Sequence, residues 1–279
     1  MFNSSMFQSI KDALNKTSEQ SSGNALYNEV LKTTEGNTYT VRLLPFAKDP
    51  SKTFVHYYVH GWNSFATGQY VSAISPATFQ ERDPISEERF RVLRTGTEEE
   101  KEKMQAVRRT EKWLVNVYVI DDPTNPENNG KVKILRYGKQ LQKIIMEAIE
   151  GEDAEEFGSR IFDLSPNGVS FKIKVEKQGD YPSYVTSRFT NAGSKINLSA
   201  DEQKKIYDSV HTLEDLISAK SYDELKKMVD EHIYVKINSS QGTEQSVPVV
   251  NQQPKRVETV ESYDDKSVED EIDDLLKDL

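Results

Sequence analysis

The sequence predicts a mainly β domain with added helices, followed by an acidic tail. Short segments rich in β-branched and aromatic side chains recur through the body and end at Pro, Gly or Asn, which is typical of strands. Two later segments begin with capping boxes and carry apolar residues at helical spacing. After Tyr234 the chain becomes rich in Gln, Ser and Pro and loses its periodicity, which indicates a linker.

Composition narrows the class of protein. A chain of 279 residues can bury a substantial core, but only 35% of its residues are hydrophobic, so we expect part of it to stay unpacked. It has no apolar run near the roughly 18 residues of a transmembrane helix, and its N-terminus lacks the order of a signal peptide. The absence of cysteine excludes disulfides and thiolate metal sites. These features predict an intracellular soluble protein.

The net charge of −10 is unevenly distributed. Residues 257–279 contain ten acidic and two basic residues, so they carry −8 and leave −2 for residues 1–256. Residues 101–143 contain ten basic and five acidic residues. A basic region therefore lies inside a near-neutral body that carries an acidic tail, which is a pattern typical of nucleic-acid-binding proteins.

The first strands are expected from Asn37 to Pro45 and from Phe54 to Val59. His56 lies on the second of these and His60 directly after it, four positions apart, which in extended chain would place them roughly 13 Å apart, too far for one metal ion. We therefore predict no metal site there. Residues 61–94 have no regular pattern and are interpreted as a packed insertion.

A basic hairpin is the centre of the predicted fold. Strands are expected at 113–120 and 132–137, joined by a polar loop with two prolines and a closing glycine. Cations for phosphates and rings for bases on one sheet are what single-stranded nucleic acid requires. The candidate contacts here are Arg108, Arg109, Lys112, Trp113, Lys131, Lys133, Arg136 and Tyr137. Which face of the sheet Tyr137 occupies relative to Trp113 depends on the strand register.

Further elements follow the hairpin. A helix is expected at 139–149 and a strand at 169–175, and the capping boxes at Ser199 and Ser221 each open a helix, the first extending to Ile217. Between them, a turn-rich segment contributes three more candidate contacts, Tyr181, Tyr184 and Arg188. Tyrosines are often buried, but two in a polar Gly/Pro/Ser loop favour a functional role.

The two ends of the chain carry separate hypotheses. Residues 1–20 place Phe7, Ile10 and Leu14 at helical spacing, and this helix packs either on its own domain or on a neighbouring subunit. The final stretch, DEIDDLLKDL, combines acids with spaced leucines, as docking peptides do. Its predicted partner-binding residues are Asp273, Asp274, Leu275, Leu276, Asp278 and Leu279.

No motif argues for an enzyme. The sequence contains no GxxxxGK[ST] phosphate loop, no GxGxxG after a strand, no HExxH and no GxSxG. With four histidines and no cysteine it also offers little for a nucleophilic triad. We therefore predict no catalytic residues.

Several motifs occur in one order along the chain. They are VRLLP at 41–45, VHGW at 59–62, NVYVIDDPTNPENNGKVKILRYGK at 116–139, GVSFKIKV at 168–175, Y-x-x-S-R-F at 184–189, SYDEL at 221–225 and the terminal DDLLKDL. In these motifs the chain resembles the single-stranded DNA-binding, helix-destabilising proteins of T-even-type phages. The most specific is the DP-x-x-PEN-x-GKV core of the third.

The resemblance implies an OB-fold core, a five-stranded barrel, at residues 23–234 with an insertion at about 61–107. It also implies an N-terminal cooperativity arm at 1–22 and a flexible linker with an acidic partner-binding tail at 235–279. Such a protein would coat single-stranded DNA during replication, recombination and repair in the cytoplasm of the infected host cell. Its partners would be DNA, further copies of itself and phage replication and recombination proteins, with no membrane and no catalysis.

The resemblance also implies roles for single residues. Arg108 and Arg109 fall in the family's basic run, Trp113 falls at a cleft aromatic, and Tyr181 and Tyr184 fall where stacking aromatics are expected.

Two departures from the family pattern change what is expected. Known members hold zinc through one His and three Cys, whereas here His60 remains and Ile74, Asp83 and Ser86 occupy the apparent thiolate positions. We therefore expect no zinc and no other cofactor. The N-terminal arm carries few basic residues, which leaves the strength of cooperativity open.

The residues leave two other functions open. In the first, the protein is a scaffold without nucleic acid, its tail docks partners and the basic region is a solvated face. In the second, it is a metal hydrolase.

Overall fold

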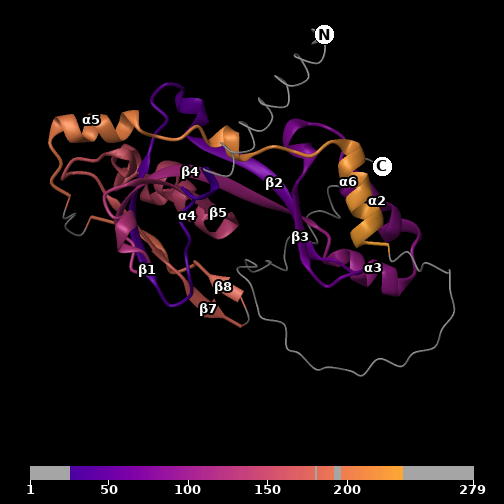
Figure 1. The fold of residues 1–279 in the computed structure, drawn as a ribbon. Helices are drawn as coiled ribbons and strands as arrows, with labels where there is room; N and C mark the ends of the chain where they lie inside the picture. The colour runs from indigo at the N-terminus through magenta and orange to yellow at the C-terminus, as the bar shows by residue number, and fades with distance from the viewer. Residues whose placement is uncertain (1–25, 180, 192–195, 235–279) are drawn as a thin grey trace, which may run out of the picture.

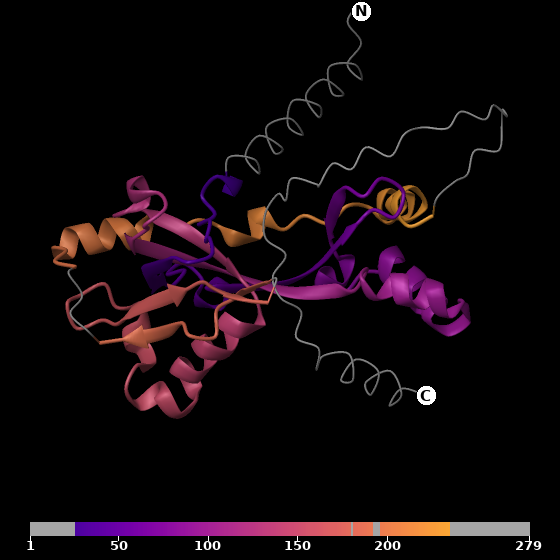
Figure 2. The ribbon, with the colours of Figure 1, turned by 90° about the horizontal axis from the view of Figure 1, so that it is seen from below.

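The computed structural model describes residues 26–179, 181–191 and 196–234, which form two lobes joined by long strands (Figure 1). The larger, which we call the sheet lobe, contains most of the sheet with α4 and α5. The smaller, the insertion lobe, contains the tips of β2 and β4 with β3, α2, α3 and α6, and Figure 2 shows the strands that bridge the two. The predicted arm at 1–22 and tail at 235–279 lie outside the described residues.

The chain alternates strands and short helices. The strands are β1 (Thr38–Leu44), β2 (Phe54–Asn63), β3 (Tyr70–Ile74), β4 (Arg109–Asp121), β5 (Val132–Tyr137), β6 (Ser170–Lys174), β7 (Glu176–Gln178), β8 (Tyr181–Ser183) and β9 (Arg188–Thr190). The α-helices are α2 (Pro84–Thr95), α3 (Glu98–Gln105), α4 (Lys139–Glu150), α5 (Ala200–Asp208) and α6 (Tyr222–His232). Short 3-10 helices are η1 (Pro50–Lys52), η2 (Pro76–Phe79), η3 (Pro126–Asn128), η4 (Glu152–Glu155), η5 (Gly158–Phe162) and η6 (Leu213–Leu216).

Seven strands form one antiparallel sheet in the order β3-β2-β4-β1-β6-β9, with β5 paired to β4, while β7 and β8 form a separate pair. The predicted strands at 37–45, 54–59, 113–120, 132–137 and 169–175 are confirmed as β1, β2, β4, β5 and β6. The fold is mixed α/β, with a mostly antiparallel sheet and flanking helices. Within the described residues no strand pairing closes the sheet into a barrel.

Strand β4 connects the lobes. Its residues 109–115 pair with β2 and its residues 116–121 pair with β1, so these two strands follow one another along one edge. On the other edge β5 pairs with residues 113–118 only. Residues 109–112 of β4 therefore face the space between the lobes along that edge.

The core of the sheet lobe follows the period-two pattern of its strands. Val115, Val117 and Val119 of β4 alternate into it, and α4 covers it with Leu141 and Ile145. The helix predicted at 139–149 is thus confirmed, and its apolar face is the one that the spacing indicated.

The insertion is more regular than predicted. Residues 61–94 contain the end of β2, the strand β3, and the helix α2, which begins after Asp83. The Asp83 side chain accepts hydrogen bonds from the Ile85 and Ser86 amides, and Pro84 fills the first helical position, where it needs no N–H donor. The expectation of an irregular segment was wrong because this start signal was not used.

The two capping boxes near the end of the body are confirmed, at Ser199 with Glu202 and at Ser221 with Glu224. The helix expected to run from Ser199 to Ile217 is shorter, however. Helix α5 ends at Asp208, and residues 213–216, with Leu213 and Leu216 as their apolar side chains, form the separate 3-10 helix η6. This break lets Leu213 and Leu216 pack against β2 and β4. No helix in the described ranges is long and apolar enough to cross a lipid bilayer.

Candidate nucleic-acid interface

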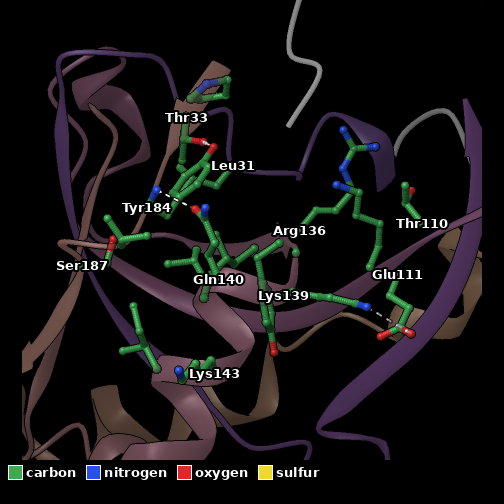
Figure 3. Close-up of a pocket in the computed structure, with 18 of the residues that line it drawn as sticks. Leu31, Thr33, Thr110, Glu111, Arg136, Lys139, Gln140, Lys143, Tyr184 and Ser187 are labelled. Carbon is green, nitrogen blue, oxygen red and sulfur yellow. Dashed lines mark hydrogen bonds and ion pairs between the residues drawn. The ribbon is translucent and has the colours of Figure 1, made fainter. Parts of the chain in front are cut away.

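A cleft of about 1670 Å³ lies between the two lobes. Six segments line it: residues 27–34, the β2–β3 ribbon, the start of β4, the junction of β5 with α4, the end of α4 with residues 153–157, and the β7–β8 hairpin with residues 184–189 that follow it (Figure 3). These segments are far apart in the sequence. The edge of β4 that β5 leaves unpaired opens into this cleft.

Cations outnumber acids on the lining of the cleft. It carries eight basic and four acidic side chains. The basic ones are Lys32, Arg108, Arg109, Lys112, Arg136, Lys139, Lys143 and Arg188. Among the acids, Glu111 lies 3.8 Å from Lys139 and 3.8 Å from His56, whereas Glu147, Asp153 and Glu156 come from the end of α4 and the segment that follows it. A polyanion would therefore be attracted to the β4 end of the cleft.

The start of β4 places two arginines at the cleft. The Arg109 guanidinium lies over the ring of Tyr58, 4.2 Å from its centroid, which holds the cation against the β2 surface. The Thr110 hydroxyl donates to the Val59 carbonyl and fixes the start of the strand. Arg108 and Arg109 are both partly exposed and line the cleft, as predicted.

Lys112 and Arg136 lie on neighbouring strands. Burial and, to a smaller extent, the positive charge of Arg136 together lower the pKa of Lys112 to about 7. The side chain of Arg136 is exposed and hydrogen bonds to Tyr57, whose own pKa burial raises to about 12 although that bond opposes the shift. Two cations placed this close favour an anionic ligand between them.

Exposed tyrosine rings lie on opposite walls of the cleft, and Tyr27, which is 51% exposed, lines it as well. Tyr70 of β3 is 57% exposed and Tyr181 of β8 is 42% exposed. Tyr70 lies over the backbone of Gly61 on β2, where an added Cβ would be 2.2 Å from its hydroxyl oxygen. The glycine therefore allows the ring to approach the strand. Exposed rings at the rim of a basic cleft are what base stacking requires.

Tyr184 and Tyr137 line the cleft but are buried, at 8% and 1% exposure. The Tyr184 hydroxyl bonds to that of Thr33 at 3.0 Å, and its amide donates to Gln140 Oε1 (Figure 3). Tyr137 is the cross-strand neighbour of Trp113, with parallel rings 6.2 Å apart, so the two share a face. Burial leaves the Tyr137 ring no free face for a base, so it does not favour the predicted stacking.

Three predicted residues lie outside the cleft lining. Trp113 is partly buried beside His56, 4.8 Å away between ring centroids, and packs against the core of the sheet lobe. Lys133 is buried and forms an ion pair with Glu29 at 2.8 Å. Lys131 is exposed in the β4–β5 loop, at the opposite end of β5 from the cleft. The pattern of basic residues on the hairpin did not reveal which face each one occupies.

The structure adds residues that sequence reasoning missed as contacts. Tyr58, Tyr70 and Lys32 line the cleft, as do Lys139 and Lys143 one turn apart on α4. A single glycine within a strand, Gly61, over which the Tyr70 ring lies, was the available signal for that ring. The predicted tail residues 273–279 lie outside the described residues.

A zinc site of the kind implied by the resemblance does not fit this chain. It has no cysteine, and the described residues contain no group of three or more His, Asp or Glu side chains that could hold a metal. Of the four positions, His60, Asp83 and Ser86 are joined by hydrogen bonds to one another, and hydroxyl groups are not the ligands that structural zinc uses.

The chain is similar to known DNA-binding proteins. Residues 34–269 match the family model described as "gp32 DNA binding protein like". A single-stranded DNA-binding protein of Enterobacteria phage T4 is 25% identical over 190 residues, 66% of this chain and 62% of that protein. One of Enterobacteria phage T2 is 30% identical over 124 residues, 43% of this chain and 41% of that protein. The chain thus spans less than two thirds of the length of these relatives.

Proposed function

Because the chain belongs to the gp32-like family of phage DNA-binding proteins, we propose that it binds single-stranded DNA in the cleft between its lobes. Membership places it among DNA-binding proteins rather than enzymes. The observation that carries the proposal is the pairing of exposed rings, Tyr70 and Tyr181, with the guanidinium groups of Arg108, Arg109 and Arg136 in one cleft.

In the proposed complex the cations and the aromatic rings contact different parts of the DNA. Arg108, Arg109, Lys112, Arg136 and Arg188 neutralise phosphates, which gives affinity without reading the bases. Tyr70 and Tyr181 stack on bases, and every base offers a ring face, so binding tolerates any sequence. The buried Tyr184 shapes the wall between them.

The family relation supports a wider role. We infer that the protein coats single strands cooperatively during phage DNA replication, recombination and repair in the infected cell. We further infer that the sheet lobe is an OB-type fold with an insertion between β2 and β4. We propose that the core at 23–234 binds DNA, that the arm at 1–22 mediates cooperative association, and that the linker and tail at 235–279 bind partners.

Tryptophan fluorescence titrated with oligo-dT at two salt concentrations tests the function. Quenching that weakens with salt supports it, and no response at low salt favours the scaffold function. Arg109→Ala is expected to reduce the salt slope by about 0.7, the value for one lost phosphate contact on a single strand. Lys131→Ala, outside the cleft, is the matched control and is expected to keep the wild-type slope.

The acidic tail is proposed to compete with DNA for the cleft. Its net charge of −8 is opposite in sign to that of the cleft lining. Truncation after Lys255 is therefore expected to tighten oligo-dT binding, most visibly at low salt, where charge interactions are least screened. Equal affinities with and without residues 256–279 would remove the competition and leave the tail to partner docking alone.

A further inference from the structure

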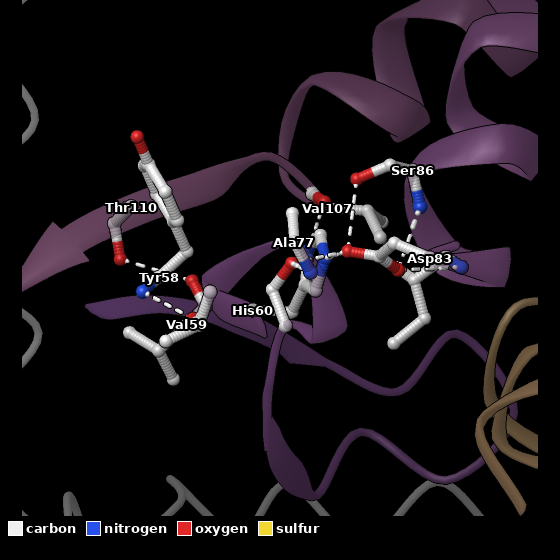
Figure 4. Close-up of polar contacts among 11 residues, drawn as sticks. Tyr58, Val59, His60, Ala77, Asp83, Ser86, Val107 and Thr110 are labelled. Atoms are coloured by element: carbon white, nitrogen blue, oxygen red, sulfur yellow. Dashed lines mark hydrogen bonds and ion pairs between the residues drawn. The ribbon is translucent and has the colours of Figure 1, made fainter. Parts of the chain in front are cut away.

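A buried polar cluster lies in the insertion lobe, next to the start of β4 (Figure 4). Its centre is the pair His60 and Asp83, with 2.7 Å between the imidazole Nε2 and the carboxylate Oδ2. His60 is fully buried and Asp83 is 6% exposed. Such a pair is costly to bury unless further hydrogen bonds satisfy it.

Asp83 receives those bonds from both sides. Its Oδ2 also accepts from the hydroxyls of Ser75 and Ser86, and its Oδ1 accepts from the amides of Ile85 and Ser86 at the start of α2. Burial alone would raise the pKa of Asp83, but the hydrogen bond and charge of His60, together with hydrogen bonds from the Ser75 hydroxyl and the Ser86 amide, hold this pKa well below its usual range. One carboxylate thus joins β2, the β3–η2 turn and α2.

His60 connects this cluster to the DNA-binding strand. On β2 its cross-strand neighbour in β4 is Arg109, and its Nδ1 lies 3.4 Å from the carbonyl oxygen of Val107. Val107 is itself fully buried in the core of the insertion lobe. The two residues on either side of Arg108 are therefore both fixed by His60, one through the sheet and one through its imidazole.

We infer that the His60–Asp83 cluster positions Arg108 and Arg109 for single-stranded DNA and does so without a metal ion, an inference that rests on the proposed function. His60 and Asp83 are positioning residues, since they are buried and do not line the cleft. The cluster organises the insertion lobe by directional hydrogen bonds at the positions where the resemblance implies zinc ligands. The lobe is accordingly independent of zinc.

The test compares Asp83→Ala with a matched control in the full-length chain. Asp122 is 1% exposed and also caps its own loop, accepting from the amides of Thr124 and Asn125 and from Asn128, but it lies at the far end of β4, outside the cleft. Asp122→Ala therefore removes a comparable set of bonds away from the arginines. Each variant is measured for thermal unfolding and for oligo-dT affinity as a function of salt.

Both substitutions are expected to lower the midpoint of unfolding, but only Asp83→Ala to lower the salt slope. Displacement of both arginines reduces the slope by about 1.4 and weakens binding at 0.1 M salt roughly five- to twentyfold. Asp83→Asn keeps an acceptor for the helix start. It is therefore expected to show smaller losses of the unfolding midpoint and of the salt slope than Asp83→Ala. Chelator and added Zn²⁺ leave the wild-type unfolding midpoint and affinity unchanged.

A folded Asp83→Ala protein with the wild-type slope, or the same slope change in Asp122→Ala, overturns the inference. So does a wild-type protein that chelator destabilises and Zn²⁺ restores. If Asp83→Ala does not fold, Ser86→Ala, which removes one bond to Oδ2, decides the matter by the same slope. Failure of the wild-type protein to bind oligo-dT would instead refute the proposed function and is visible before any variant is made.

Discussion

The two lobes that form the cleft are held together in different ways. The sheet lobe buries nineteen apolar and aromatic residues in one cluster, whereas the insertion lobe buries ten and has a polar centre at His60 and Asp83. Apolar packing is not directional and tolerates small shifts, while hydrogen bonds require fixed geometry. One wall of the cleft is therefore set by a large core, and the other by the geometry of a few polar contacts.

This difference bears on the proposed binding of DNA in the cleft. The open ring of Tyr70 belongs to the insertion lobe, and that of Tyr181 belongs to the hairpin of the sheet lobe. A single strand with one base stacked on each of these two rings would extend across both walls of the cleft. The distance between these rings then depends on the polar cluster more than on the apolar core.

The largest effect is expected from the core of the sheet lobe. Phe171 is fully buried and stacks on Phe189, with 4.4 Å between ring centroids. Phe171→Ala should lower the free energy of unfolding by about 3–5 kcal/mol, because it loses burial and leaves a cavity. Urea denaturation followed by circular dichroism measures it.

The matched change in the insertion lobe is Met228→Ala, at a position that is 8% exposed. If the lobes differ as described, Met228→Ala should raise the rate of amide hydrogen exchange in α2 and α6 while the strands of the sheet lobe keep their protection from exchange. Uniform loss of protection in both lobes would show that they unfold as one unit and would remove the contrast.

The sheet lobe was largely predictable because its strands obey one simple rule. Val115, Val117 and Val119 alternate toward the core, and the glycine-closed loop before Val132 sets up the hairpin. The position of Tyr137 was not predictable, because only the register makes it the neighbour of Trp113 and places it in the core. Lys133 was misplaced for a similar reason, since its acid partner Glu29 lies far away in the sequence.

The insertion lobe was poorly predictable because its organisation is polar and non-local. The helix α2 had a readable start in Asp83 and Pro84, but no local pattern indicates that Asp83 meets His60, twenty-three positions earlier, and only the resemblance, which places both at zinc-ligand positions, implies that they lie together. Hydrogen bonds among buried side chains leave no periodic pattern. Only the topology of β2, β3 and α2 brings these residues together.

A smaller effect, on oligo-dT affinity, is expected to distinguish substitutions of exposed tyrosines from substitutions of buried ones. Tyr70→Ala removes an exposed stacking surface and should weaken oligo-dT binding by about 1–3 kcal/mol with little loss of stability. Tyr137→Phe removes only a hydroxyl that donates to Gln142 and should leave affinity unchanged. Gly61→Ala should act like a mild Tyr70→Ala, because the added methyl displaces the ring. Equal losses for Tyr70→Ala and Tyr137→Phe would mean that exposure does not identify the stacking residues.

The smallest effect expected is a pH dependence of binding through Lys112, on the part of β4 that joins the lobes. Its pKa of about 7 leaves the amine roughly half protonated at neutral pH in the free protein, and a phosphate beside it favours the charged form. Binding therefore takes up part of a proton, so oligo-dT affinity should fall as pH rises from 7 to 9, by less than about tenfold per pH unit. Lys112→Arg stays charged and should flatten the profile, whereas Lys143→Arg on the exposed face of α4 should keep it.

The lowered pKa of Lys112 acts on folding stability with the opposite sign. The unfolded chain, with a lysine pKa near 10.5, binds more protons above pH 7, so Lys112 makes the free protein more stable as pH rises from 7 to 10. A profile in which affinity and stability rise together with pH would exclude Lys112 as the group responsible.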